Sequence, residues 1–228
     1  MSKKQDKKRI TQSIHNAALL YKHNLVGKRF LYVFNNRYIE VIYKAENFRH
    51  LTGVETNLSA KDFYRKAVQG KLSESQFWFS ANHPYQLCKR KIKHIGDIST
   101  LAGSAKLILE EIVTDTQSFR FGATNLNFTL CLNKKTDNLG NSNGDCFTVH
   151  SLRDENCLSK CKSSYVVQYI ISRANDQKKY TDILFRDAQA NIFNLPDDVL
   201  NLLDESLLSN ILINSQRNKI YLDENLIS

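Results

Sequence analysis

The sequence predicts an α+β fold in which N-terminal helices pack on one face of a four- to five-stranded antiparallel sheet, followed by a C-terminal helix. Two observations predict it. Apolar residues recur at helical spacing in several segments before residue 98, and after residue 117 they alternate with polar residues. Helices followed by a run of strands are typical of α+β proteins, and period-two alternation is typical of an antiparallel sheet with one covered face.

The N-terminal third is expected to hold a helix and a hairpin. Residues 1–9 are rich in lysine and are expected to form a basic, disordered arm before a single domain over residues 10–228. A helix of about 15 residues follows, with its apolar stripe at Ile10, Ile14, Ala17, Ala18, Tyr21 and Leu25. Strands are expected at 29–34 and 37–43, joined by the turn-forming pair Asn35-Asn36.

Two further helices have clear start signals. Ser59 is a suitable N-cap for a helix that ends at Gly70, and His83-Pro84 opens another helix. Residues 98–113 fit a helix or a strand, and we favour a helix.

The second half of the chain contains five segments with period-two alternation, at residues 117–123, 126–132, 146–152, 164–171 and 179–185. After Leu195-Pro196 the pattern predicts a C-terminal helix from Asp197 to about Leu212, and a short strand near Ile220–Leu222 is possible.

Composition and charge narrow the function classes. The net charge of the 228 residues is +9, and the first nine residues supply +4 of it, so the remaining charge is consistent with nucleic-acid binding but also with an ordinary soluble surface. The five cysteines are odd in number, no apolar leader precedes them, and no run approaches a membrane span. We therefore expect a protein of the reducing cytoplasm of a bacterial host cell, with no membrane partner and no cofactor.

Two clusters of side chains are candidate binding sites. Cys146, His150, Cys157 and Cys161 have spacings that zinc sites tolerate, but ordinary cysteines fit the same pattern and we expect no metal. Another cluster is basic and falls on the predicted third helix: Lys89, Arg90, Lys91 and Lys93. A phosphate backbone would relieve the repulsion between these cations, although a solvated helix surface would look the same.

Two further features suggest chemistry. If the phenylalanines of the first strands after residue 117 point inward, polar side chains such as Arg120 and His150 share the open face, as in any half-solvated sheet. The segment Phe48–Val54 places His50 two residues before Thr52, with Gly53 behind them. Histidine can transfer protons near neutral pH, yet a lone histidine is more often structural.

Several segments together resemble a phage-borne branch of the barnase–EndoU–colicin–RelE-like nucleases. The most specific is N-F-x-H-L-T-G-V at residues 47–54. Looser matches are Ala17-Ala18, Tyr38–Val41, Phe63-Tyr64, Gly70–Ser73, Ser151-Leu152 and Lys179–Leu184. The resemblance covers residues 10 to about 205. It implies a barnase/RelE-like fold and a metal-independent endoribonuclease that forms 2′,3′-cyclic phosphate ends.

On this resemblance His50 would be the base or acid. Lys71 and Arg120 would bind the phosphate, the latter on strand alternation alone, and Thr52, Ser151 and Tyr180 would hydrogen-bond it or orient the base. The resemblance implies no second histidine, although His150 could form a pair with His50. RNA would be the substrate, and a toxin or effector of a phage or mobile element would have a cognate inhibitor protein.

Two other functions stay open at this point. One is a non-catalytic nucleic-acid-binding protein on the same scaffold, and the other is a protein-interaction module of a mobile element. The sequence does not fix the cleavage specificity or the oligomeric state.

Overall fold

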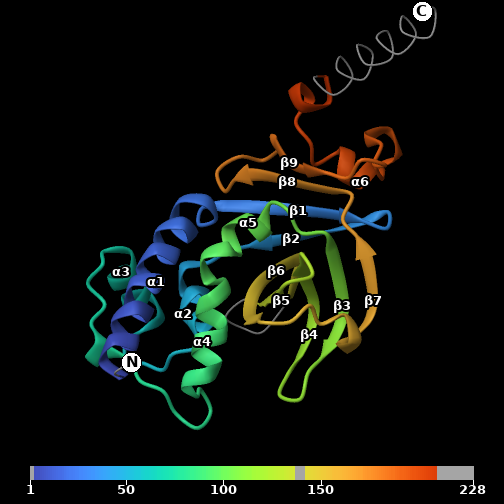
Figure 1. Cartoon of the computed structure of the whole chain (residues 1–228). Coiled ribbons are helices and arrows are strands. Elements are labelled where there is room, and N and C mark those ends of the chain that lie inside the picture. Colours follow the sequence, from blue (N-terminus) through green and yellow to red (C-terminus); the bar gives the residue numbers. More distant parts are fainter. Residues whose placement is uncertain (1–2, 137–141, 210–228) are drawn as a thin grey trace, which may run out of the picture.

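A computed structural model describes residues 3–136 and 142–209 (Figure 1). The described strands are β1 Lys28–Phe34, β2 Arg37–Ile42, β3 Leu107–Val113, β4 Ser118–Thr124, β5 Thr129–Thr136, β6 Ser142–Arg153, β7 Cys161–Val166, β8 Tyr169–Ala174 and β9 Asp182–Arg186. The described helices are α1 Lys3–Asn24, α2 Phe48–Thr52, α3 Ala60–Val68, α4 Tyr85–His94, α5 Ile98–Ala102 and α6 Asp197–Leu200.

All these strands belong to one mixed sheet, in the order β7-β3-β4-β5-β6-β2-β1-β8-β9. Every neighbouring pair is antiparallel except β2 and β6, which run parallel. The sheet is strongly curved. Arg37 at the start of β2 reaches Glu110 of β3, although β4, β5 and β6 lie between these strands in the sheet. The rings of Phe34 in β1 and Tyr165 in β7 also meet, with their centroids 5.6 Å apart.

The predicted four- to five-stranded antiparallel sheet is therefore wrong in its size and in its strand directions. Residues 107–113 form β3 rather than the favoured helix, and only residues 98–102 are helical. The segment 164–171 is not one strand, because the chain turns at Val167 and Gln168. The backbone amide of Val167 donates a hydrogen bond to the carbonyl of Lys106, just before β3, and that of Gln168 donates to the carbonyl of Val33 in β1. The hairpin of β1 and β2 joins the same sheet through β6.

The chain ends differ from the predictions as well. Helix α1 begins at Lys3, so most of the segment expected to be a disordered arm forms its first turns. The predicted helix from Asp197 to about Leu212 is interrupted. Helix α6 ends at Leu200, Leu203 pairs with Tyr180 in a parallel bridge, and residues 205–209 are helical again. Residues 210–212 and the possible strand near Ile220–Leu222 lie outside the described residues.

Several local predictions are confirmed. Asn35 and Asn36 have φ values of 46° and 54°, which is the geometry that a two-residue hairpin turn requires. The Ser59 side chain accepts a hydrogen bond from the backbone amide of Asp62 at the start of α3. Gly70 follows α3 with a φ of +66°.

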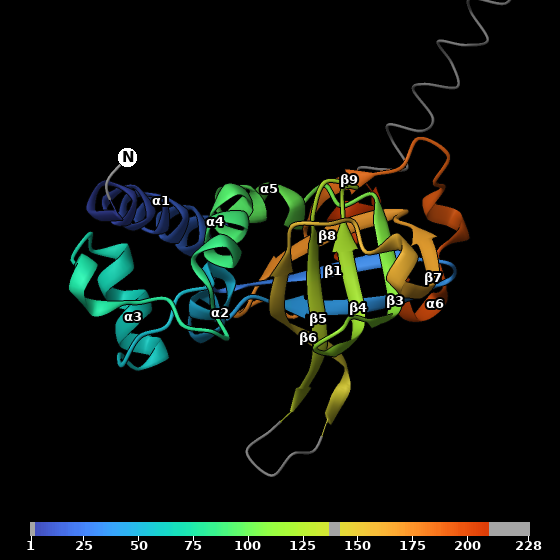
Figure 2. The same cartoon turned by 60° about the horizontal axis from the view of Figure 1, so that its bottom comes forward.

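The N-terminal helices gather at one side of the curved sheet (Figures 1 and 2). Their apolar stripes and the inner face of the sheet form the largest core cluster, which includes Ile14, Tyr21, Phe34 and Phe147. On the opposite face of β1 and β8, a second cluster is covered by the chain from Tyr180 to Leu203. No helix in the described ranges has the length and apolarity that crossing a membrane requires.

Candidate active site

The segment predicted to carry chemistry forms helix α2. Phe48 and Leu51 are fully buried in the main core, which leaves His50 exposed on the opposite side of the short helix. Gly53 ends the helix in the left-handed region, with a φ of +72°. Helix α2 packs against β6, α3 and α4, so the core fixes the position of His50.

A pocket of about 260 Å³ opens beside His50. Its lining includes Arg49, Glu55 and His83. The imidazole Nδ1 of His83 lies 2.9 Å from a carboxylate oxygen of Glu55, which also accepts a hydrogen bond from the Ser80 hydroxyl at 2.5 Å. Glu55 therefore holds His83 at the rim of the pocket.

A second histidine approaches His50 from the sheet. Residues 149 and 151 of β6 pair with residues 132 and 131 of β5, so His150 is the extra residue of a β-bulge. Bulges redirect a side chain and are frequent beside active sites. His150 is exposed and close enough to His50 to lower the pKa of its imidazole.

Lys91 connects this site to α4, the basic helix that carries the predicted cluster of lysines and arginine. Its Nζ donates a 3.0 Å hydrogen bond to the backbone carbonyl of His50. The residue is only 8 % exposed, and burial together with the nearby Arg153 lowers the pKa of its amine to about 8. Gly53 allows this approach, because a Cβ there would lie 3.0 Å from Cδ of Lys91.

The site is electrostatically positive. Burial lowers the pKa of His50, and Arg49, His150, Lys91 and His83 lower it further. Like charges that face one another out of bulk water raise the energy of the empty site, and a bound anion relieves that repulsion. The arrangement therefore suits an anionic group, such as a phosphate, beside an imidazole that can exchange protons.

Comparison with known proteins identifies the family of the chain. The model of the family described as phage-Barnase-EndoU-ColicinE5/D-RelE like nuclease4 matches residues 13–189. The chain belongs to this nuclease family. The match confirms the resemblance seen in the sequence, and the family name indicates nuclease activity in general. No curated protein and no solved structure matches the chain significantly.

Within this nuclease the other predicted site residues are dispersed. Thr52 is fully buried, and its hydroxyl donates to the carbonyl of Arg49 and accepts from the amide of Val54, so it holds the end of α2. Ser151 follows His150, but it is buried and pairs with Cys131 on the face away from the main core. Lys71 is exposed just after α3, where Gly70 faces His15 of α1.

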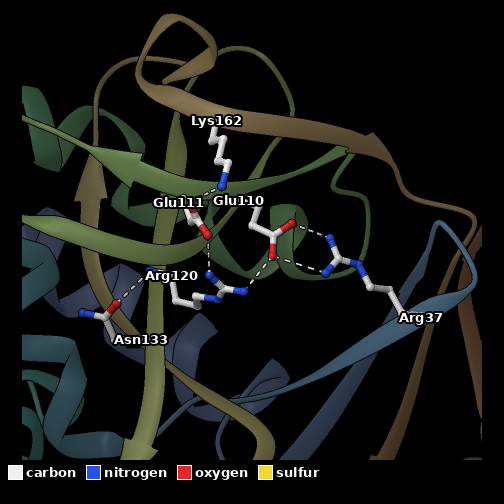
Figure 3. A network of polar contacts seen from close by, with 6 residues as sticks. All are labelled: Arg37, Glu110, Glu111, Arg120, Asn133 and Lys162. Carbon is white, nitrogen blue, oxygen red and sulfur yellow. Dashed lines mark hydrogen bonds and ion pairs between the residues drawn. The ribbon is translucent and has the colours of Figure 1, made fainter.

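Arg120 lies in a separate ion network (Figure 3). Its guanidinium donates to Glu110 at 2.9 Å and to Glu111 at 2.7 Å. Arg37 binds the Glu110 carboxylate as well, and Lys162 binds Glu111 at 3.1 Å. Because two carboxylates already occupy Arg120, it is not available as the free phosphate ligand that strand alternation suggested.

Tyr180 also belongs to a separate network. Its ring is buried on the far face of the sheet, and its hydroxyl donates a 2.5 Å hydrogen bond to Glu40. Arg29 and Arg173 bind the same carboxylate. Burial and the Glu40 carboxylate raise the pKa of Tyr180, so it stays a neutral hydrogen-bond donor with a structural role.

The four cations of the basic helix α4 lie in different surroundings. Lys89 and Arg90 are exposed, Lys91 is buried under His50, and Lys93 lies 3.6 Å from the carboxylate of Asp154. Only part of the predicted basic surface is therefore free to face a phosphate backbone.

The predicted zinc alternative does not assemble. Within residues 3–136 and 142–209, no three His, Cys, Asp or Glu side chains form a group that could hold a metal ion. Cys146 lies beside Glu40, Cys157 lies beside Cys131, and the thiol of Cys161 donates to the carbonyl of Leu158.

Sequence reasoning missed three contributors, namely Arg49, His83 and Glu55. Arg49 stands next to His50 in the motif and could have been included on that ground. His83 and Glu55 are 28 residues apart, and only folding brings them together.

Proposed function

We propose that this nuclease is a metal-independent endoribonuclease that cleaves RNA between His50 and His150. The observation that supports the proposal is that α2, which carries His50, packs against β6, where His150 is the extra residue of a β-bulge, and that Arg49, His150 and Lys91 lie close enough to lower the pKa of His50. Two imidazoles flanking one phosphodiester can act as a base and an acid without any other group.

The reaction would use the 2′-hydroxyl of the RNA as its own nucleophile. One imidazole removes the hydroxyl proton, the oxygen forms a bond to phosphorus, and the bond from phosphorus to the 5′-oxygen breaks. The other imidazole gives a proton to that departing oxygen. The products are a 2′,3′-cyclic phosphate and a 5′-hydroxyl, with no change in oxidation state.

The electrostatics favour His50 as the base. Its lowered pKa keeps the imidazole neutral near neutral pH, which a base requires. Arg49 and the buried ammonium of Lys91 would stabilise the charge that gathers on the phosphoryl oxygens.

The test is cleavage of an RNA oligonucleotide in EDTA, with the ends identified by mass spectrometry. Wild type should leave 2′,3′-cyclic phosphate, and a substrate with one 2′-deoxy sugar at the cleaved position should stay intact. His50→Ala and His150→Ala should each lose about 10²- to 10⁴-fold in rate. His23→Ala, an exposed histidine of α1, is the matched control. Cleavage that persists unchanged in His50→Ala would overturn the proposal.

The phage-type family also leads us to propose a toxin or effector that acts on cellular RNA and is held in check by a cognate inhibitor protein. Expression of wild type should arrest bacterial growth, whereas His50→Ala should be tolerated. Equal growth of the two strains would exclude this role, and RNA binding without cleavage would indicate the non-catalytic alternative.

A further inference from the structure

A second pocket lies on the other side of Lys91. It measures about 260 Å³ and is formed by α4, the turn between β3 and β4, and the chain around the end of β6. Arg90, Lys91, Arg153 and Lys160 contribute four cations, and Thr114 and Thr116 contribute hydroxyls. Lys91 belongs to both places, since it lines this pocket and also binds the His50 carbonyl.

The acidic residues of this pocket are directed toward other partners. Glu155 binds Lys160 at 2.8 Å, and Asp115 also acts on Lys160. Asp154 binds Nε2 of His94 at 2.5 Å and lies 3.6 Å from Lys93. Among the described residues, Arg90, Lys91 and Arg153 have no ion pair with a carboxylate at all.

The position of Arg153 is fixed. Its guanidinium lies over the Phe119 ring, 5.5 Å from the centroid, and one terminal nitrogen donates to Thr114 at 3.4 Å and Thr116 at 3.2 Å. Its buried Nε has no hydrogen-bond partner in the described part of the chain. Lys91 lies close enough to feel this guanidinium. Two cations that are partly out of water and have no counter-ion favour an anion between them.

We propose that this second pocket binds a neighbouring phosphate of the RNA, next to the one cleaved at His50. The inference rests on the proposed endoribonuclease function and names its extended substrate, an RNA with phosphates beyond the scissile one. Arg153 supplies a planar donor that its contacts hold in place, Arg90 supplies an exposed one, and Lys91 connects both phosphate positions to α2. Arginine suits this role because its guanidinium matches phosphate oxygens in geometry.

The first experiment measures binding without cleavage. A fluorescent 2′-O-methyl oligoribonucleotide, which has no free nucleophile, is titrated with wild type and with Arg90→Gln/Arg153→Gln. Loss of hydrogen bonds to a charged partner should weaken binding at least about tenfold and make its salt dependence less steep. The control Lys61→Gln/Lys178→Gln removes the same charge from two exposed lysines that lie outside the basic cluster and do not line the pocket, and it should lose much less.

Folding and ligand source are checked in the same series. The single variant Arg90→Gln changes an exposed side chain, so it tests the pocket even if Arg153→Gln fails to fold. Inorganic phosphate is added as a competitor. If it displaces the oligonucleotide from wild type and from the Arg90/Arg153 variant equally, the pocket does not hold a phosphate.

The second experiment separates this pocket from the cleavage site. A dinucleoside monophosphate carries only the scissile phosphate and cannot occupy the second pocket. The Arg90→Gln/Arg153→Gln variant should therefore keep its kcat/KM on the dinucleotide and lose about tenfold or more on a longer RNA. Equal losses on both substrates, or a loss matched by the Lys61/Lys178 control, would overturn the inference. Failure of the wild type to cleave RNA would count against the proposed function alone, because the binding experiment would still test the pocket.

Discussion

Lys91 donates a hydrogen bond from its buried amine to the backbone carbonyl of His50, with 3.0 Å between nitrogen and oxygen. This bond joins the basic helix α4 to the motif helix α2. It places one positive charge between the pocket at His50 and the pocket at Arg153. The basic cluster and the histidine motif, which are separate in the sequence, are therefore parts of one surface.

Lys91→Met is expected to change how stability depends on pH. Burial lowers the pKa of this amine from 10.5 to about 8, so the unfolded chain binds more protons between those values. The stability of wild type should therefore rise relative to Lys91→Met between pH 8 and 10.5, by up to about 3 kcal/mol. Urea unfolding at several pH values measures this difference. Lys89→Met, on the exposed side of α4, should show none, and a flat difference for Lys91→Met would contradict the burial of its charge.

Gly53→Ala should destabilise the protein and disturb the site together. At a φ of +72° an alanine is strained, and its Cβ would lie 3.0 Å from Cδ of Lys91 and 3.1 Å from Cα of Cys88. We expect a loss of about 1–3 kcal/mol in unfolding free energy and slower RNA cleavage. Gly96→Ala is the matched control, since no atom lies within 4 Å of its Cβ position. Thermal unfolding of both variants checks this, and equal effects would argue against a special role for Gly53.

Arg49→Gln should shift the pH profile of cleavage. Burial first, and then Arg49, lower the pKa of His50 below 6.5. Removing the guanidinium should raise that pKa, so the acidic limb of kcat/KM should move to higher pH. An NMR titration of the His50 ring should move in the same direction. Lys61→Gln, which removes an exposed charge at the start of α3, should leave both curves in place. A shift to lower pH in Arg49→Gln would contradict the assignment.

Tyr180→Phe should reduce stability while sparing catalysis. The tyrosine hydroxyl donates a 2.5 Å hydrogen bond to the Glu40 carboxylate, in a network with Arg29 and Arg173 that shares no residue with the lining of the His50 pocket. Losing a hydrogen bond to a charged group costs about 1.5–3 kcal/mol. Urea unfolding should detect this, whereas RNA cleavage should stay close to that of wild type. Tyr38→Phe serves for comparison. A large loss of cleavage activity in Tyr180→Phe would show that Tyr180 takes part in the active site.

Local signals in the sequence predicted local structure well. Asn35-Asn36, Ser59 and Gly70 act through backbone geometry within a few residues, and each forms the turn, cap or helix end that was expected. The motif histidine could also be selected in this way, because Phe48 and Leu51 require burial and thereby leave His50 exposed. The family resemblance was readable from the same short segment.

The pairing of strands that are far apart in the chain could not be predicted from the sequence. Residues 107–113 fit a helix or a strand by pattern, and they became β3 because both β4 and β7 pair with them. The parallel pairing of β2 with β6 joins segments about a hundred residues apart, and no period in either segment specifies it. The same holds for the ion network of Arg37, Glu110 and Arg120, which required the curvature of the sheet (Figure 3).

The sequence by itself determined the nuclease family, the exposed histidine of the motif and the alternation that builds most strands, because these depend on neighbouring residues and on side-chain polarity. The tertiary structure decided the size of the sheet, the approach of β6 with His150 to α2 with His50, and the separate places of Thr52, Arg120 and Tyr180. Those outcomes depend on which distant groups meet in space. The β-bulge at His150 and the bond from Lys91 to the His50 carbonyl are two examples, because neither can be predicted from the sequence pattern.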